Sequence, residues 1–132
     1  MINDVISDFI TRIRNASLVR HQIVQTRCTK LTKEIAIVLK NEGFIEDFEI
    51  FKHQTFNHLF IYLKYKRKGR QPGIRFLKRV SKPGRRIYSN KRNLPKGIGN
   101  FGTVILSTSR GIMSDRKARK MNLGGEILFY IY

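Results

Sequence analysis

The sequence holds one cluster of short hydroxyl side chains whose spacing could carry chemistry, the hydroxyl segment Ser107-Thr108-Ser109-Arg110-Gly111. A catalytic serine needs a neighbouring base that a third group orients. The last histidine of the chain is His58, and the nucleophile motif Gly-x-Ser-x-Gly is absent. A nucleophilic role is therefore not predicted, and we expect no catalytic residue.

Hydrogen bonding suits the hydroxyl segment better than catalysis. Each Ser or Thr hydroxyl can both donate and accept, and Gly111 lets another backbone come close. These are the properties that recognise phosphate, ribose 2′-hydroxyls and base edges. An ordinary turn, followed by a helix that Ser114 caps, explains the same spacing. The sequence alone leaves both interpretations open.

Two further features could take part in the same recognition. Arg85 and Arg86 stand beside Tyr88. Arginine forks pair with phosphates, and a tyrosine ring can stack on an unpaired base, although Tyr88 could equally lie at the edge of the core. Glu126 is the only acid after Asp115. It could orient basic side chains, accept a hydrogen bond from a base, or form a plain surface salt bridge.

The glycine motif Gly97-Ile-Gly99-Asn-Phe-Gly102 has the spacing of a dinucleotide-binding loop. Such a loop needs a strand before it, a helix after it and an acid about 20 residues on. Here Pro95-Lys96 precedes it and β-branched Thr103-Val104-Ile105 follows, so we expect a loop that packs against a sheet, and no cofactor. The three histidines and the single cysteine have no metal-ligand spacing, so no metal site is predicted.

Charge is distributed unevenly along the chain. Lys and Arg number 27 against 9 Asp and Glu, a formal net charge of +18. Seven acids balance seven bases up to Glu49, whereas the stretch from Ile50 to Ser114 holds 16 bases and no acid. Such a charge repels itself unless a polyanion neutralises it. The composition predicts a nucleic acid as partner, ahead of an anionic membrane, and no small-molecule substrate.

The first part of the chain has the pattern helix, strand, helix, strand, strand. Apolar residues at three- and four-residue steps from Ile2 to Ile13 predict a helix that ends at Asn15. The following predicted elements are a strand over 21–28, a helix from Thr29 or Thr32 to Gly43, and a hairpin of strands over 44–50 and 59–63.

The second part follows a basic linker that contains Gly and Pro. It predicts short strands over 74–80, 86–89, 103–106 and 126–132, a Pro83-Gly84 turn, and one short basic helix from Ser114-Asp115 to Asn122. We therefore predict an α+β fold of two small units. An N-terminal α-β-α-β-β unit spans 1–66, a linker spans 67–73, and a mostly-β nucleic-acid-binding unit with one short helix spans 74–132.

Nothing in the sequence predicts a membrane location. No apolar run reaches the roughly 20 residues of a membrane-spanning helix. The acidic start Met1-Ile2-Asn3-Asp4 resembles neither a signal peptide nor a transit peptide. The lone Cys28 fits a reducing compartment. We expect a protein that works where it is made.

Several strings stand in a characteristic order along the chain. They are Asp8-Phe-Ile-Thr-Arg-Ile-Arg-Asn-Ala16, Glu42-Gly-Phe-Ile-Glu46, Ser81-Lys-Pro-Gly-Arg-Arg-Ile-Tyr88, Ser107-Thr-Ser-Arg-Gly-Ile-Met-Ser-Asp115, Ala118-Arg119 and Gly124-Gly-Glu-Ile127. Together they closely resemble the S8 family of small-subunit ribosomal proteins, in its bacterial and plastid form. The resemblance spans essentially the whole chain.

The resemblance implies a structural constituent of the small (30S) ribosomal subunit. Its C-terminal part would bind a helix in the central domain of small-subunit ribosomal RNA and support subunit assembly and translation. It implies contacts with neighbouring small-subunit proteins, the fifth and the twelfth. It also implies RNA contact for matching residues, which together with the adjacent arginines give the expected RNA-binding set: Arg85, Arg86, Tyr88, Ser107, Thr108, Ser109, Arg110, Gly111 and Glu126.

Some positions depart from the family pattern. Asn100 stands where the family usually has glycine, which puts the shape of the preceding loop in doubt, and Ser114 replaces threonine but keeps a capping hydroxyl. Phe129 replaces a common cysteine, and Arg27-Cys28 replaces Pro-Ser. The abundance of Lys, Ile and Asn resembles a plastid-encoded form. We expect a ribosome of the chloroplast stroma, with the bacterial cytoplasm as the alternative.

Two functions of other classes remain to be separated from RNA binding. An RNA-modifying or RNA-cleaving enzyme would need its catalytic groups from the histidines or the acids, which cluster in the neutral first part, away from the basic stretch. An architectural DNA-binding protein would share the charge, and competition between matched RNA and DNA duplexes would separate it.

Overall fold

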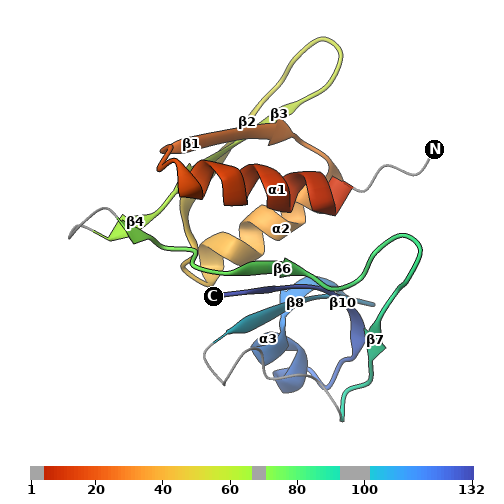
Figure 1. Cartoon of the computed structure of the whole chain (residues 1–132). Helices are drawn as coiled ribbons and strands as arrows, with labels where there is room; N and C mark the ends of the chain where they lie inside the picture. The colour runs from red at the N-terminus through yellow and green to blue at the C-terminus, as the bar shows by residue number, and fades with distance from the viewer. Residues whose placement is uncertain (1–4, 67–70, 93–101) are drawn as a thin grey trace. The chain divides into compact units, whose positions relative to one another are not determined.

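The computed structural model describes residues 5–66, 71–92 and 102–132 of the chain. The chain forms two compact units, one from Val5 to Arg75 and one from Phe76 to Tyr132 (Figure 1). Each combines helix with antiparallel sheet, which confirms the predicted α+β class. The predicted functional division into 1–66, a linker over 67–73 and an RNA-binding unit over 74–132 stays a prediction.

The N-terminal unit folds in the predicted order of helix, strand, helix, strand, strand. Its three strands pair antiparallel in the order β1-β3-β2. Buried side chains alternate along β1 and β3, and both helices pack against this buried face (Figure 1). The elements are α1 (Val5–Leu18), β1 (Ile23–Arg27), α2 (Lys30–Asn41), β2 (Ile45–Phe51) and β3 (His58–Leu63).

Helix α1 follows the apolar periodicity of its sequence but ends later than predicted. The end predicted at Asn15 is wrong, because the helix continues to Leu18 and buries Ala16 in its last turn. Arg20 then adopts a φ of 59°, and the His21 amide donates to the Ala16 carbonyl at 2.9 Å, which closes the helix. The buried stripe of α1 consists of Ile6, Phe9, Ile10 and Ile13.

Helix α2 has both of the ends that its sequence predicts. Thr29 is the N-cap, and its hydroxyl accepts from the Thr32 amide at 3.1 Å. The Thr32 hydroxyl accepts from the Thr29 amide at 2.8 Å in return, so both predicted threonines act in one reciprocal cap. Gly43, at a φ of 81°, ends the helix in a conformation that glycine adopts without strain.

The C-terminal unit is built around strand β10. This strand pairs with β6 and β7 along one edge and with β8 along the other, and β9 extends the sheet beyond β8. Its burial agrees with the predicted apolar strand. The elements are β6 (Leu77–Arg79), β7 (Tyr88–Ser89), β8 (Thr103–Thr108), β9 (Gly111–Ser114), α3 (Asp115–Lys120) and β10 (Gly125–Ile131).

Strand β6 is shorter than the strand predicted over 74–80. The register of β10 against β8 shifts between Ile127 and Phe129, and the Val80 amide donates to the carbonyl of Leu128 within this bulge. Regular pairing of β6 therefore stops at Arg79. The predicted Pro83-Gly84 turn is present, since the residues on either side of it exchange two backbone hydrogen bonds of 2.9 Å.

A buried carboxylate fixes helix α3 to the sheet. Asp115 is 2% exposed, and its Oδ1 accepts from the Val104 amide of β8 at 3.1 Å. Its Oδ2 pairs with Arg119 at 2.7 Å. Ser114 caps the helix as predicted, because its hydroxyl accepts from the Lys117 amide at 3.3 Å. The core cluster between the helix and the sheet consists of Val104, Leu106, Met113, Ala118 and Ile127.

Some predictions lie outside the described residues. They concern the glycine motif up to residue 101, the departure at Asn100, and linker residues 67–70. On either side of that linker segment, β4 (Tyr65–Lys66) pairs with β5 (Gln71–Pro72). None of the helices in the described part of the chain has the length and apolar character needed to cross a membrane.

The burial of Asp115 makes its removal costly. We expect Asp115→Ala to lower the free energy of unfolding by about 2–3 kcal/mol, because it leaves a buried amide without an acceptor. Asp8→Ala is a matched control, since Asp8 pairs with Arg12 at the same four-residue spacing but is 59% exposed, and we expect little change. Urea denaturation followed by circular dichroism measures both variants. Equal losses would contradict the anchoring role.

Candidate nucleic-acid interface

The hydroxyl segment forms the tip of the β8–β9 hairpin. Thr108 pairs with Gly111, so Ser109 and Arg110 form a two-residue loop. The Thr108 hydroxyl donates to the Gly111 carbonyl at 2.8 Å and accepts from the Arg110 amide at 3.2 Å. Gly111 has a φ of 109°, which glycine adopts far more readily than other residues. The Thr108 hydroxyl therefore helps to close the turn.

The rest of the hydroxyl segment faces outward to different degrees. Ser109 and Arg110 are exposed, whereas Ser107 and Gly111 are half-buried. The cap and the turn are thus both present, as the structural interpretation of this segment requires. Ser114 makes the helix cap and Thr108 closes the turn. The side chains of Ser109 and Arg110 in the loop remain at the surface.

Strand pairing brings together residues from three distant parts of the sequence. Glu126 of β10 lies opposite Tyr88 of β7 on one side and opposite Ser107 of β8 on the other. Directly opposed residues in a sheet point to the same face. Tyr88, Glu126 and Ser107 therefore form a transverse row, and the next row, through Gly125, ends at Thr108 and Ser89.

Two glycines allow this row to form. A Cβ atom at Gly125 would overlap the Ser107 carbonyl, and a Cβ atom at Gly124 would overlap the Ser89 carbonyl. Only glycine lets β10 come this close to both neighbours. The glycine pair is evident in the sequence, but its packing role was not predicted. A glycine doublet directly before a buried strand was the available signal.

Tyr88 and Glu126 have environments that narrow their roles. Tyr88 is 69% exposed, so it is not a core-edge residue. Glu126 Oε2 pairs with Arg86 Nη1 at 3.0 Å, and its side chain is 15% exposed. Glu126 therefore forms an ion pair with a neighbouring arginine, which is one of the roles that the sequence left open.

The loop that carries Arg85 and Arg86 is held from beneath by Ser81. This serine is fully buried, and its hydroxyl accepts from the Ile87 amide at 2.9 Å and donates to the Ile87 carbonyl at 3.2 Å. Arg85 closes the tight turn with Lys82 and is exposed. Ser81 therefore fixes the backbone at the end of the loop that carries both arginines. The sequence did not predict this role, because a serine before Lys-Pro-Gly gives no sign of burial.

In the described part of the C-terminal unit, the exposed charged side chains are basic. Its two carboxylates, Asp115 and Glu126, are each paired with an arginine. Basic side chains remain exposed around them, so the field that a polyanion would meet is positive. The exposed basic residues in the described part of this unit are Lys78, Lys82, Arg85, Arg86, Lys91, Arg92, Arg110, Arg116, Lys117 and Lys120.

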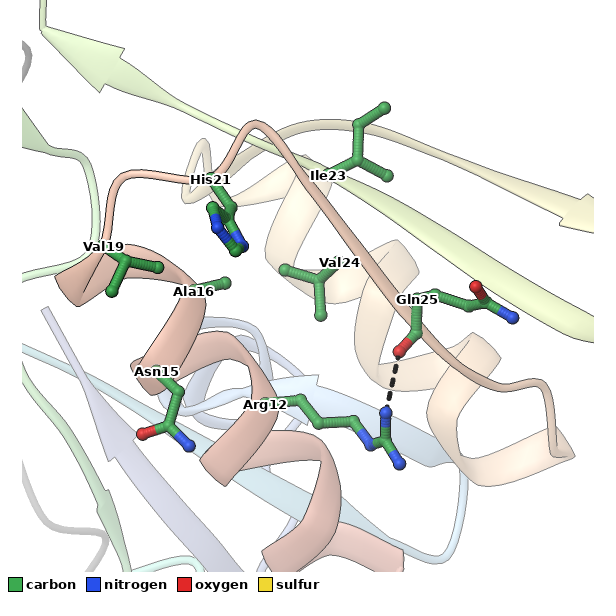
Figure 2. Close-up of a pocket in the computed structure, with 8 residues that line it drawn as sticks. All are labelled: Arg12, Asn15, Ala16, Val19, His21, Ile23, Val24 and Gln25. Carbon is green, nitrogen blue, oxygen red and sulfur yellow. Dashed lines mark hydrogen bonds between the residues drawn. The ribbon is translucent and has the colours of Figure 1, made fainter.

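A separate cavity lies within the N-terminal unit, between α1 and β1 (Figure 2). It measures about 460 Å³, and Arg12 spans part of it to donate to the Gln25 carbonyl at 3.2 Å. Its lining contains no carboxylate, hydroxyl or thiol. The lining residues are Arg12, Asn15, Ala16, Val19, His21, Ile23, Val24 and Gln25.

Comparison with known proteins decides the family. The model of the family "Ribosomal protein S8" matches residues 4–132. The chain belongs to the ribosomal protein S8 family. The small ribosomal subunit protein uS8 of Crocosphaera subtropica is 56% identical over 130 residues, which cover 98% of each chain. The uS8c proteins of Pyropia yezoensis and Trieres chinensis are 54% and 52% identical over 132 residues, with 99% and 100% of their own lengths covered.

Membership in the ribosomal protein S8 family confirms the resemblance found in the sequence. The family is a structural component of the ribosome and not an enzyme, so the enzymatic alternative is set aside. Plastid-type and cyanobacterial relatives of this S8-family chain have similar identities, so they fit a plastid origin without separating it from a bacterial one.

Because β10 lies so close to β8 at Gly125, a larger residue at this position should destabilise this S8-family chain. We expect Gly125→Ala to destabilise the C-terminal unit by about 1–3 kcal/mol, the usual cost of overpacking. In the NMR spectrum of this variant, the backbone amide signals of Tyr88 and Ser107 should shift. Gly84→Ala is the control, because a Cβ there meets no atom within 4 Å. Thermal melting and NMR measure both variants, and equal effects would contradict the packing argument.

Proposed function

We propose that this chain is a primary binder of small-subunit ribosomal RNA, in its central domain, and that its C-terminal unit makes the contact. The observation that carries the proposal is the transverse row of Tyr88, Glu126 and Ser107 beside the exposed Ser109–Arg110 loop. It joins a ring, a carboxylate and hydroxyls at the β8–β9 hairpin end of a sheet whose exposed charges are positive. Folded RNA offers matching groups in its bases, 2′-hydroxyls and phosphates.

Each side chain has a distinct task in this proposal. Arg85 and Arg110 bind phosphates, because exposed guanidinium groups match the geometry of phosphate oxygens. Ser107 and Ser109 hydrogen-bond to ribose or base edges. Tyr88 stacks on an unpaired base, since its ring is 69% exposed.

The remaining members of the expected set position the others. Glu126 holds Arg86 through the ion pair of 3.0 Å, which fixes the direction of the guanidinium. Thr108 closes the hairpin turn through its two hydrogen bonds with Gly111 and Arg110. Gly111 then lets the RNA backbone approach the turn, because it carries no side chain.

The proposal extends to the surroundings of the chain in the ribosome. The fifth and twelfth small-subunit proteins are the neighbours that the family resemblance implies. We place the ribosome in the plastid stroma on the strength of the composition and of plastid-type relatives that match the whole chain. The bacterial cytoplasm is the alternative, and recovery of the chain with plastid ribosomes separates the two.

Substitutions in the hydroxyl segment test the polar contacts. We expect Ser107→Ala and Ser109→Ala each to weaken binding to cognate ribosomal RNA by about 1 kcal/mol, or up to ~3 kcal/mol where a buried RNA group loses its partner. Their melting temperatures should stay unchanged. Thr108→Ala should lower the melting temperature as well, because its hydroxyl closes the turn. If all three variants lose stability while the folded proteins keep their affinity, the segment is only scaffold.

Salt dependence tests the charged contacts and the specificity. We expect Arg85→Gln to weaken binding to all RNAs and to flatten the log–log salt slope by about 0.7–0.9, the equivalent of one phosphate. Lys33→Gln removes one exposed charge from the N-terminal unit and should leave the slope unchanged. Filter binding with cognate and random RNA measures both. If the two RNAs converge in affinity as salt rises, recognition is purely electrostatic and the proposed polar contacts are wrong.

A further inference from the structure

The N-terminal sheet has one face that its helices do not cover. Alternate residues of β1 and β3 are buried beneath α1 and α2, and the residues between them point to the opposite face. Strand register arranges this opposite face in three transverse rows. The rows are Ile23, Tyr62 and Asp47, then Gln25, Phe60 and Glu49, then Arg27, His58 and Phe51.

The two acidic residues in these rows, Asp47 and Glu49, each have a partner within the N-terminal unit. Asp47 pairs with Lys40 at 3.0 Å, and this hydrogen bond holds the pKa of Asp47 below its ordinary value. Desolvation and the carboxylate of Glu49, which accepts a hydrogen bond from the Tyr62 hydroxyl, raise the pKa of Tyr62 above its ordinary value. Both carboxylates therefore already have a hydrogen-bonding partner in the N-terminal unit.

The aromatic cluster, which we define as Phe51, His53, Phe56, His58 and Phe60, lies at the β2–β3 hairpin end of this face and reaches the middle row, where Phe60 is opposite Glu49. Ring centroids lie 4.8 Å apart for Phe51 and Phe60 and 4.9 Å apart for Phe56 and His58. The cluster's pairs meet at interplanar angles between 44° and 79°, so no two rings cover each other by parallel stacking. Phe51 is 48% exposed and Phe56 is 37% exposed, a large aromatic surface to leave in water.

Positive charge accompanies the aromatic cluster. The Arg27 guanidinium lies 4.9 Å from the centre of the Phe56 ring, and both Arg27 and Lys52 are exposed. The hairpin loop that follows β2 contains no acid, because the acid-free stretch of the sequence begins at Ile50. Gln25 hydrogen-bonds to the His58 ring at 3.0 Å and fixes its orientation.

Ring surface and positive charge together indicate the chemistry of the ligand. A ligand that is only an anion would use the two cations but not the exposed rings. A purely apolar partner would be disfavoured by the charges of Arg27 and Lys52. Unpaired nucleotides offer both a flat base for the rings and a phosphate for the cations. Paired RNA hides its base faces inside the helix and fits poorly.

We propose that the aromatic cluster is a second RNA contact, which stacks unpaired nucleotides of ribosomal RNA at the β2–β3 end of the N-terminal sheet. Arg27 and Lys52 bind the phosphates that flank the stacked bases. Because ribosomal RNA supplies the nucleotides, this contact rests on the proposed function. It differs in chemistry from the C-terminal surface, where hydrogen bonds from hydroxyls carry the recognition.

A tryptophan reporter tests the stacking directly, since the chain contains no tryptophan. Full-length Phe56→Trp is titrated with single-stranded octa-adenylate and with a paired duplex of the same length. We expect the single strand to quench the fluorescence and the duplex to have little effect. Leu18→Trp is the control, because Leu18 is 76% exposed at the end of α1, and its fluorescence should not change. Equal quenching in both variants, or none in either, would overturn the proposal.

Affinity measurements separate stacking from ordinary apolar docking. We expect the double variant Phe51→Leu, Phe56→Leu to bind octa-adenylate and small-subunit ribosomal RNA roughly tenfold more weakly, the loss expected for one base–ring stack. Phe56→Tyr keeps the ring and should keep the affinity. Circular dichroism confirms that each variant is folded. Unchanged RNA affinity in the leucine variant would show that the cluster serves another partner, such as a protein, and would overturn the proposal.

The same measurements distinguish this contact from the C-terminal one. Ser107→Ala with Ser109→Ala should weaken binding to ribosomal RNA but leave the quenching by octa-adenylate intact. If the wild-type chain fails to prefer ribosomal RNA over random RNA, the proposed function fails. If it prefers ribosomal RNA and the leucine variant binds it equally well, only the aromatic contact fails.

Discussion

The packing of β10 against both of its neighbours is the constraint on which the C-terminal surface depends. Gly124 and Gly125 remove the side chains that would hold β7 and β8 away. The gap left by the missing side chains is filled by backbone, and Tyr88, Glu126 and Ser107 then stand in one row. The row is therefore a consequence of main-chain packing and not of attraction among its own side chains.

The C-terminal unit keeps a positive net charge, and both of its acidic residues are paired with arginines. Asp115 lies inside, where it binds a strand amide and an arginine and stabilises the fold. Glu126 lies at the surface row, where it orients Arg86. Because both carboxylates have fixed partners, the exposed lysines and arginines of this unit define its field, as expected for a ribosomal protein that meets a polyanion.

The two units expose different side-chain chemistry on their antiparallel sheets. In the N-terminal unit, strand alternation buries one face under helices and leaves rings and an arginine on the other. In the C-terminal unit, the surface lies at the β8–β9 hairpin tip and the adjoining end of the sheet, where hydroxyls and guanidinium groups are exposed. Stacking tolerates any base, whereas hydrogen bonds discriminate among groups, so the two proposed contacts would divide affinity and specificity between them.

Local patterns in the sequence determined most of the secondary structure. The apolar spacing from Ile6 to Ile13, the threonine cap at Thr29, the stop at Gly43 and the cap at Ser114 each act within a few residues. The acid-free stretch predicted the polyanionic partner, and the characteristic strings predicted the family. These features need no knowledge of distant contacts, because helix caps, periodicity and net charge are properties of neighbouring residues.

Tertiary structure alone decided how the candidate site is assembled. The later end of α1 depends on the burial of Ala16, and the short β6 depends on a bulge in β10. The sequence suggested Ser107 and Thr108 as equivalent hydroxyls, whereas the hairpin turn uses Thr108 for itself. The alignment of Tyr88 with Glu126 joins residues far apart in the chain. Strand register fixes such pairs, and register depends on packing across the whole sheet, which no local pattern in the sequence encodes.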